Sequence, residues 1–202
     1  MSPWPTPDRF DPQPTLEGVL VRLRPLRAED HDALYVVASD PLIWEQHPEN
    51  NRHEPEVFRR FFDEAIERGG ALAVLDAAGG AVIGSSRYHD YDGARSAVEI
   101  GWTFLARKYW GGRYNGEMKQ LMMDHAFRYV DHVLFVIGPE NRRSRRAVEK
   151  VGGTFLEMRT VEQGERCVYR ISAPRVATRA GAPAAGGRTA PATGEPGARA
   201  AR

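Results

Sequence analysis

The sequence predicts a single α/β domain in which helices flank a mixed β-sheet. Strand-like segments separated by short turns dominate the first half of the chain, which is typical of hairpins. The second half alternates strands with helices, which is typical of strand–helix–strand units. The length of 202 residues, with 42% hydrophobic and 27% charged residues, fits one globular domain with tails.

The first half is expected to form strands and helices separated by turn-forming residues. Pro25 ends a strand of alternating apolar and basic residues. Pro55 lies in the first turn of a helix that Gly69 and Gly70 follow. The expected strands are Val19–Arg24, Ala71–Asp76 and Ala81–Tyr91, and the expected helices are Ala28–Ala38 and Pro55–Arg68.

The second half begins with a long expected strand, Arg95–Leu105. Strict alternation places Val98, Ile100, Trp102 and Phe104 on one face of this strand. The opposite face then carries Glu99, Gly101, Thr103 and Leu105. The remaining expected elements are a loop over Ala106–Arg113, a helix that runs to Val130, a strand Val133–Ile137, a helix Asn141–Val151 and closing strands Thr154–Met158 and Arg166–Ile171.

The helix that runs to Val130 carries two apolar stripes. The main stripe consists of Met118, Leu121, Met122, Ala126 and Tyr129. The second stripe consists of Met123, Phe127 and Val130. A helix with two apolar stripes is expected to be covered on more than one side.

Both ends of the chain differ from the body, which we assign to residues 17–172. Residues 1–16 contain five prolines and are expected to form an extended arm. Residues 173–202 contain 11 Ala, 5 Gly and 4 Pro, so they cannot offset their ordering entropy and are expected to be disordered. The five arginines of this tail could contact RNA or an acidic partner, but a solvated extension is the interpretation we favour.

Composition and charge exclude several classes of protein. The net charge is only +1, so no nucleic-acid partner is expected. The start of the chain lacks signal-peptide features, and no stretch approaches the roughly 20 apolar residues of a membrane span. Cys167 is the one cysteine, which fits a reducing, cytoplasmic location and excludes a CxxC metal site. His47 and His53 lack helix-face spacing, so no metal is expected.

The most informative stretch runs from Glu99 to Glu117, where a buried strand leads into a glycine-bearing loop that opens a helix. Free N–H groups in such a loop and the helix dipole both favour an anion. The stretch lacks the GK[ST] of a P-loop, and glycines at 111, 112 and 116 do not follow GxGxxG. From the residues alone, an anion site and a tight turn packed against the sheet both stay open.

A second helix start follows at Asn141, which is a favourable N-cap residue with Ser144 three positions later. Four basic residues surround this start: Arg142, Arg143, Arg145 and Arg146. Positive charge in the first turn of a helix is mildly unfavourable. Either these arginines are solvated, or a phosphate-bearing ligand lies beside them.

Three segments, together with the order of elements, resemble the GNAT superfamily of N-acetyltransferases. They are the loop Trp110-Gly-Gly-Arg-Tyr-Asn115, the helix start Asn141-Arg-Arg-Ser144 and the stretch Ala147-Val-Glu-Lys-Val-Gly152. The resemblance covers Leu16–Ser172 and is strongest to the RimJ/RimL type of ribosomal-protein N-acetyltransferase. It implies a mostly antiparallel central sheet flanked by helices, with strands splayed apart at an acyl-CoA cleft. It also implies acetyl-CoA as co-substrate and, because family members often dimerise, a possible homodimer.

The resemblance also implies which residues contact acetyl-CoA. The family's pyrophosphate loop follows Q/R-x-x-G-x-G/A, so Trp110 takes the first position and Asn115 the last. Arg113 stands where the fourth-position glycine is usual, which leaves the dihedral angles of the loop in question. The implied cofactor-binding residues are Trp102, Thr103, Phe104, Leu105, Trp110, Gly111, Gly112, Arg113, Tyr114, Asn115, Asn141 and Arg143.

The chemistry implied by the resemblance is direct attack of an amine on the acetyl-CoA thioester. Ser144 then corresponds to the proton donor for the leaving thiolate, and the Phe104 N–H is a candidate oxyanion donor. Glu99 is the candidate base, and it suits an α-amine with a pKa of about 7.7–8.0 better than a lysine with a pKa of about 10.4. The alternative for Glu99 is a structural carboxylate paired with Arg87 or Arg95.

The acceptor amine, either a protein N-terminus or a small molecule, cannot be read from the residues. Candidate substrate-binding residues are Trp44, His47, Arg87, Tyr88 and His89. A nucleophilic role for Cys167 is not favoured, because its neighbours suggest a closing strand. The alternative function is a non-catalytic acyl-CoA-binding or regulatory domain. The presence of both Glu99 and Ser144 favours the enzyme.

Overall fold

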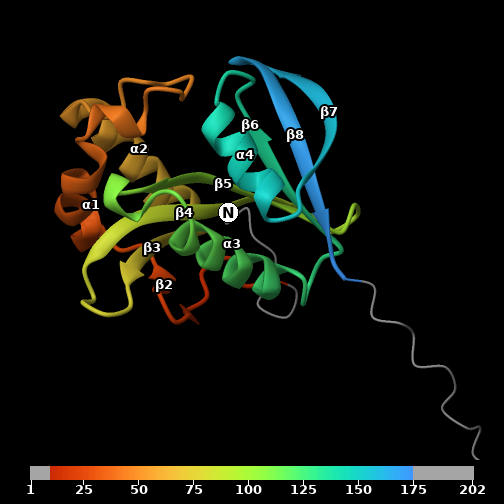
Figure 1. Cartoon of the computed structure of the whole chain (residues 1–202), viewed down its shortest axis with the longest axis horizontal. Coiled ribbons are helices and arrows are strands. Elements are labelled where there is room, and N and C mark those ends of the chain that lie inside the picture. Colours follow the sequence, from red (N-terminus) through yellow and green to blue (C-terminus); the bar gives the residue numbers. More distant parts are fainter. Residues whose placement is uncertain (1–9, 175–202) are drawn as a thin grey trace, which may run out of the picture.

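The computed structural model describes residues 10–174, which form one eight-stranded sheet with helices on both faces (Figure 1). The strands are β1 (Leu16–Glu17), β2 (Val21–Pro25), β3 (Ala71–Asp76), β4 (Val82–Asp92), β5 (Ala97–Leu105), β6 (His132–Ile137), β7 (Thr154–Val161) and β8 (Gly164–Ser172). The α-helices are α1 (His31–Ala38), α2 (Pro55–Arg68), α3 (Arg113–Ala126) and α4 (Arg142–Lys150), and the short 3₁₀ helices are η1 (Ala28–Asp30), η2 (Pro41–Ile43) and η3 (Arg107–Tyr109).

The strand order is β1-β2-β3-β4-β5-β6-β8-β7. Each neighbouring pair is antiparallel except β5 and β6, which are parallel. This confirms the predicted mixed, mostly antiparallel sheet. None of the helices within residues 10–174 is long and apolar enough to cross a membrane.

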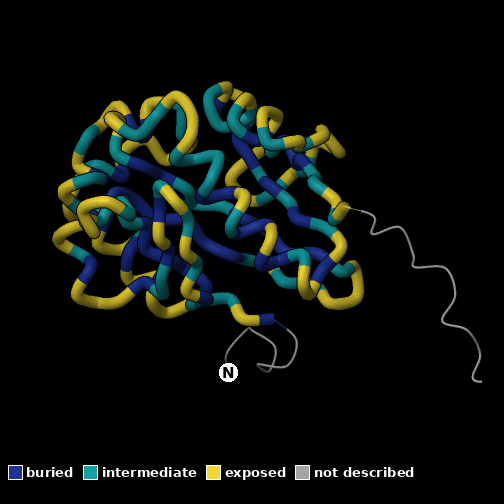
Figure 2. Tube along the Cα trace, turned by 60° about the horizontal axis from the view of Figure 1, so that its bottom comes forward, coloured by how far each residue is buried: buried dark blue, intermediate teal, exposed yellow. Residues whose placement is uncertain are grey.

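Two hydrophobic clusters lie on opposite faces of the sheet. Alternate residues of β3 separate them, because Leu72 and Val74 belong to one cluster and Ala71 and Ala73 to the other. The first cluster is covered by α3, and the second by α1 and α2. Figure 2 shows the buried segments running through the centre of the fold beneath more exposed turns.

Most predicted elements lie close to the observed ones, and the bounds of α2 and β3 agree with the prediction. The closing hairpin is longer than expected, because β7 continues to Val161 and β8 begins at Gly164. The strand β7 is at the edge of the sheet and mostly exposed, so its sequence lacks a clear apolar alternation. The helix α3 ends at Ala126 rather than Val130.

The N-terminal arm contributes to the core. Phe10 is fully buried, and its ring centroid lies 5.2 Å from that of Tyr88 and 5.3 Å from that of Tyr91. The arm also supplies β1 at its end, a two-residue strand paired with β2. Residues 1–9 and 175–202, which include nearly all of the expected disordered tail, lie outside the described residues.

The strand β5 contains a β-bulge, which the resemblance implies for this strand but which its apolar alternation does not show. Arg87 on β4 pairs with Gly101 and Ser85 pairs with Phe104, so two residues of β5 lie opposite one residue of β4. Trp102 adopts a positive φ of 49°, which costs a non-glycine residue about 1–2 kcal/mol.

The expected continuous alternation along this strand is therefore wrong. Before the bulge, Ile100 packs in the cluster covered by α3. Beyond it, Leu105 packs in that same cluster, whereas Phe104 packs against α1 and α2. The extra residue reverses the two faces, so Phe104 and Ile100 do not share a side as strict alternation requires.

A carboxylate on α3 fixes the helix to the start of the sheet. Glu117 accepts hydrogen bonds from the N–H groups of Val19, Leu20 and Val21 at 2.9, 2.6 and 2.8 Å. A Cβ atom at Gly18 would come within 2.8 Å of the same carboxylate. The turn before β2 is therefore shaped around Glu117.

Glu117→Ala is expected to lower the free energy of unfolding by about 2–3 kcal/mol, because it leaves three backbone donors without their charged acceptor. Urea denaturation followed by circular dichroism measures the change. Glu162→Ala, at an exposed position in the β7–β8 turn, is the matched control. Equal stabilities of the two variants would contradict this account of Glu117.

Candidate active site

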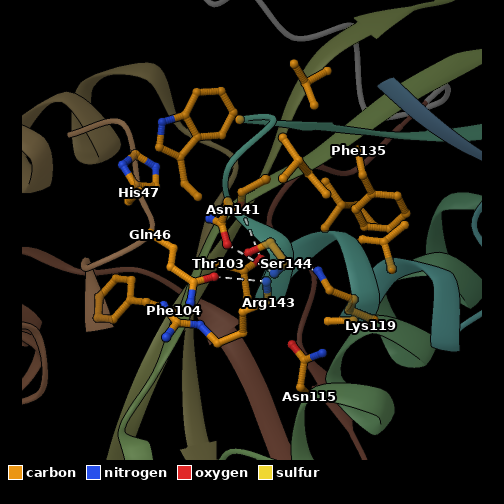
Figure 3. A pocket seen from close by; sticks show the side chains of 18 of the residues that line it. Gln46, His47, Thr103, Phe104, Asn115, Lys119, Phe135, Asn141, Arg143 and Ser144 are labelled. Carbon is orange, nitrogen blue, oxygen red and sulfur yellow. Dashed lines mark hydrogen bonds between the residues drawn. The ribbon is translucent and has the colours of Figure 1, made fainter. Parts of the chain in front are cut away.

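A cleft opens where β5 and β6 separate. The two strands pair only from Ala97–His132 to Glu99–Leu134, although β5 continues to Leu105 and β6 to Ile137. The N-terminal ends of α3 and α4 both lie at this opening, whose volume is about 1000 Å³ (Figure 3). Separated strands leave backbone groups without ladder partners, so the cleft offers hydrogen bonds to an extended ligand.

The loop that enters α3 presents main-chain donors to the cleft. The indole N–H of Trp110 donates to the Leu105 carbonyl at 2.8 Å, which fixes the start of the loop. Gly111 has a φ of 84°, and Gly112 is the N-cap residue. Within residues 10–174, the N–H groups from 111 to 115 have no hydrogen-bond acceptor. A Cβ atom at Gly111 or Gly112 would meet no atom within 4 Å, so this loop is open rather than packed against the sheet.

The start of α4 faces this loop across the cleft. Asn141 is buried and caps the helix, since its side-chain oxygen accepts the Ser144 N–H at 3.1 Å. The Arg143 N–H donates to the side chain of Gln46 at 3.1 Å. No hydrogen bond of the Ser144 hydroxyl occurs within the described residues, and this side chain lines the cleft. The hydroxyl is therefore free to bond to a ligand.

The four arginines at this helix start have different environments. Arg143 stacks 4.1 Å above the Trp110 ring and donates to the Ile43 carbonyl at 2.7 Å. Arg145 donates to the Tyr169 hydroxyl and the Pro139 carbonyl, both at 3.0 Å. Arg142 and Arg146 are exposed at the rim of the cleft. Protein contacts thus account for two of the arginines, and the other two are open to a ligand.

Glu99 is a buried carboxyl group on the wall of the cleft. Burial, with a smaller contribution from Asp90 and an opposing one from Arg159, raises its pKa to about 8. Neither alternative partner pairs with it, because Arg95 pairs with Asp92 at 3.5 Å and Arg87 stacks on the Trp102 ring at 5.0 Å. Glu99 is therefore a titratable group in contact with the cleft.

Comparison with known proteins identifies the family. Residues 21–154 match the profile described as "Acetyltransferase (GNAT) domain". The chain belongs to this family. A search of curated proteins finds no match.

Solved structures share the fold of this GNAT domain. A GCN5-related N-acetyltransferase from Brucella melitensis is 24% identical, covers 85% of this chain and 84% of its own, and has a TM-score of 0.70. Mycobacterium smegmatis RimJ in complex with CoA-disulfide is 22% identical, with coverages of 83% and 88% and a TM-score of 0.58. Spermidine N-acetyltransferase from Vibrio cholerae, in complex with CoA and spermine, is 14% identical, with coverages of 77% and 96% and a TM-score of 0.60.

Most of the residues selected from the sequence line the cleft of the GNAT domain. They are Trp44, His47, His89, Glu99, Trp102, Thr103, Phe104, Leu105, Trp110, Gly111, Gly112, Asn115, Asn141, Arg143 and Ser144. Two further selected residues, Arg113 and Tyr114, lie in the first turn of α3 but do not line the cleft. The ring of Tyr114 packs 4.7 Å from that of Tyr109.

Two of the predicted substrate-binding residues do not line the cleft. Tyr88 is buried on the α3 side of the sheet, where its hydroxyl donates to the Met122 carbonyl at 2.7 Å. Arg87 is buried beneath α2, with its guanidinium 5.5 Å from the Phe61 ring centroid. Tyr88 faces the side of the sheet opposite to His89, because consecutive strand residues face opposite sides. Arg87 shares the face of His89, since both contact the Trp102 ring, but it is covered by α2 and does not reach the cleft.

Both predicted histidines, His47 and His89, line the cleft. Burial, followed by the charge of Arg52, lowers the pKa of His47 to about 4, so its imidazole is neutral at pH 7. The pKa of His89 is also lowered, chiefly by burial, while Asp90 opposes the shift. No group of three or more metal-binding side chains occurs in the part of the chain that the structure describes.

Lys119 lines the cleft but was not selected from the sequence. Its position on α3 is one turn before Met123, which begins the second apolar stripe of that helix. A lysine that continues an apolar stripe is the signal that could have identified it. Gln46 accepts a hydrogen bond from the backbone N–H of Arg143 at the start of α4, and no pattern in the sequence indicates this contact.

The raised pKa of Glu99 predicts how stability depends on pH. The folded protein holds this proton up to about pH 8, whereas the unfolded chain releases it near 4.5. The stability from the protonated carboxyl is therefore complete below about pH 4.5 and is lost as the pH rises to about 8.

Glu99→Gln does not titrate, so it is expected to be more stable than the wild type by about 2–4 kcal/mol at pH 8 and nearly equal to it at pH 5. Urea denaturation at the two pH values measures the difference. Glu162→Gln, at an exposed site, serves as the control. A pH-independent difference would contradict the assignment of the raised pKa to Glu99.

Proposed function

We propose that the chain is an N-acetyltransferase of the RimJ/RimL type, which transfers the acetyl group of acetyl-CoA to a primary amine. One observation carries this proposal: among the described residues, the row of N–H groups from 111 to 115 has no acceptor, and it lies at the N-terminus of α3 beside the cleft. Such a row, together with the helix dipole, suits a diphosphate. The pyrophosphate of CoA supplies that group.

The separation of β5 and β6 supports a path for the pantetheine arm. Beyond Glu99, no strand of the described part of the chain pairs with the edge of β5 that faces β6. An arm with two amide groups can bond to such an edge as an added strand would. This path leads from the loop at Gly111 to the bulge at Trp102, and we place the thioester beside the bulge.

Glu99 is our candidate for the group that accepts the amine proton. With a pKa raised to about 8, it is a stronger base than an exposed carboxylate. This value lies close to the pKa of about 7.7–8.0 of an α-amine, so proton transfer between the two is nearly balanced. We therefore favour an α-amine acceptor over a lysine side chain. The Phe104 N–H stays our candidate for the oxyanion donor.

Acetyl-CoA at saturating concentration is expected to raise the melting temperature by about 5 °C or more, because a ligand at 100 times its Kd adds about 2.7 kcal/mol. Differential scanning fluorimetry measures the shift. The double variant Gly111→Val/Gly112→Val should lose it. Gly116→Leu tests the same site without backbone strain, since Gly116 has no positive φ and no atom within 4 Å of a built Cβ.

Gly79→Leu, in the hairpin between β3 and β4, is the control and should keep the full shift. Release of free thiol from acetyl-CoA, offered with pools of peptides that have free α-amines and of small amines, tests turnover. A melting shift without turnover of any amine would favour the non-catalytic acyl-CoA-binding alternative. No shift at millimolar acetyl-CoA would overturn the proposal.

Ser144→Ala is expected to lower kcat about tenfold or more, because we assign its hydroxyl a hydrogen bond to the sulfur of the leaving group. The Kd of acetyl-CoA should change little, since the backbone of the α3 loop is untouched. Steady-state kinetics and the acetyl-CoA melting shift separate the two effects. Full activity of this variant would remove Ser144 from the mechanism.

A further inference from the structure

A buried ammonium group lies in the channel between β5 and β6. Lys119 is 5% exposed, and its Nζ atom lies 3.5 Å from the Thr103 hydroxyl on β5 and 4.7 Å from the centroid of the Phe135 ring on β6. Figure 3 shows Lys119 of α3 and Ser144 of α4 pointing toward the same space from opposite sides. The lysine therefore reaches the point where the two strands have separated.

This ammonium group has no anionic partner within residues 10–174. Its polar contact is a long one to the neutral hydroxyl of Thr103, although an ammonium group has three protons to donate. Burying an unpaired charge is unfavourable, so a buried ammonium group needs an interaction that offsets its desolvation free energy. An anion that forms in the channel during the reaction would provide that interaction.

The proposed acetyl transfer brings two anionic groups to this cleft. The diphosphate has the N–H groups at the start of α3, about one helical turn away from Lys119. The second anion is the sulfur of CoA, which becomes negative only as the thioester breaks. Lys119 contacts Thr103, which together with Trp102 forms the bulge where we place the thioester.

Resting on the proposed function, we propose that Lys119 is a catalytic residue that donates a proton from Nζ to the leaving thiolate of CoA. The amine nitrogen bonds to the thioester carbon, and the C–S bond then breaks with its electron pair moving to sulfur. The sulfur takes the Nζ proton and leaves as the thiol of CoA. The amine loses its own proton to Glu99 or to water, and Lys119 regains a proton from solvent after the products leave.

The acidity of Lys119 suits this role. Burial alone lowers its pKa to about 8, close to the value of about 8.5 for a thiol. The group is thus mostly protonated at pH 7, yet it gives up its proton readily. The Ser144 hydroxyl can hydrogen-bond to the same sulfur, but it is a far weaker acid. Ser144 therefore orients the sulfur, and Lys119 protonates it.

Other titratable groups face the same cleft and bear on any pH profile. The strand β6 contributes none, and α3 contributes Lys119 itself. The remaining groups are Glu99 on β5, His89 and Asp90 on β4, His47, Glu49 and Arg52 before α2, Arg142, Arg143, Arg146 and Lys150 on α4, and Arg166 on β8. A comparison of variants is therefore needed to assign a titration to Lys119.

The decisive experiment compares acetyl-CoA with acetyl-selenocoenzyme A, whose selenolate leaves without needing a proton. Lys119→Met is expected to lower kcat with acetyl-CoA by about 100-fold or more, with a Kd within about threefold of the wild type. With the selenoester, the loss should shrink below about tenfold. The kcat of the wild type is expected to fall above about pH 8, where Lys119 loses its proton. Lys119→Arg should recover part of the activity that Lys119→Met loses, and its kcat should not show this fall. Lys108→Met is the control for loss of one positive charge and should keep full activity.

Three results would overturn the role of Lys119. Lys119→Met could keep its kcat, or it could lose the same factor with both donors despite a native melting curve. It could also lose activity toward succinyl-CoA while gaining activity toward acetyl-CoA. That result would indicate that Lys119 binds the carboxylate of a dicarboxylic acyl group. In each case an active wild type leaves the proposed acetyl transfer intact, whereas an inactive wild type overturns both proposals.

Discussion

The site depends on the point at which β5 and β6 stop pairing. Three residue pairs hold the strands together, and beyond Glu99 they separate. Antiparallel neighbours on either side, β4 and β8, keep each strand in place after the separation. The open edge of β5 is therefore a stable feature of the sheet, although isolated strand edges usually attract another strand. The first turns of α3 and α4 both contribute residues to the cleft beside this edge.

Burial accounts for the titration of both central groups in the cleft. It raises the pKa of the Glu99 carboxyl and lowers that of the Lys119 ammonium, and both come to about 8. The pKa values of a carboxyl and a lysine amine in water differ by about six, so burial has shifted the two pKa values in opposite directions until they are similar. Removal of water thus gives the carboxyl that we propose as proton acceptor and the ammonium that we propose as proton donor pKa values near neutral pH.

The sequence predicted the order of elements because turn residues and apolar periodicity mark them locally. Pro55 and Gly69 mark the bounds of α2, and glycines mark the loop that enters α3. Only the resemblance implied the bulge at Trp102, because an inserted strand residue leaves no signal in the alternation, and the bulge changed which residues share a face. Phe10 escaped prediction because its partners lie far along the chain. Lys119 was overlooked because a charged residue in a helix is usually read as solvated.

The contacts of Arg143 join the two halves of the cleft. Its guanidinium stacks on Trp110, at the start of the loop that enters α3, and bonds to the backbone at Ile43. The segment that holds Gln46 and His47 follows directly and lines the opposite wall. In the acetyl transfer that we propose, a donor molecule that orders the Trp110 loop would also order this wall, where we place the acceptor. Such a linkage favours sequential kinetics in which the nucleotide binds first and the amine second.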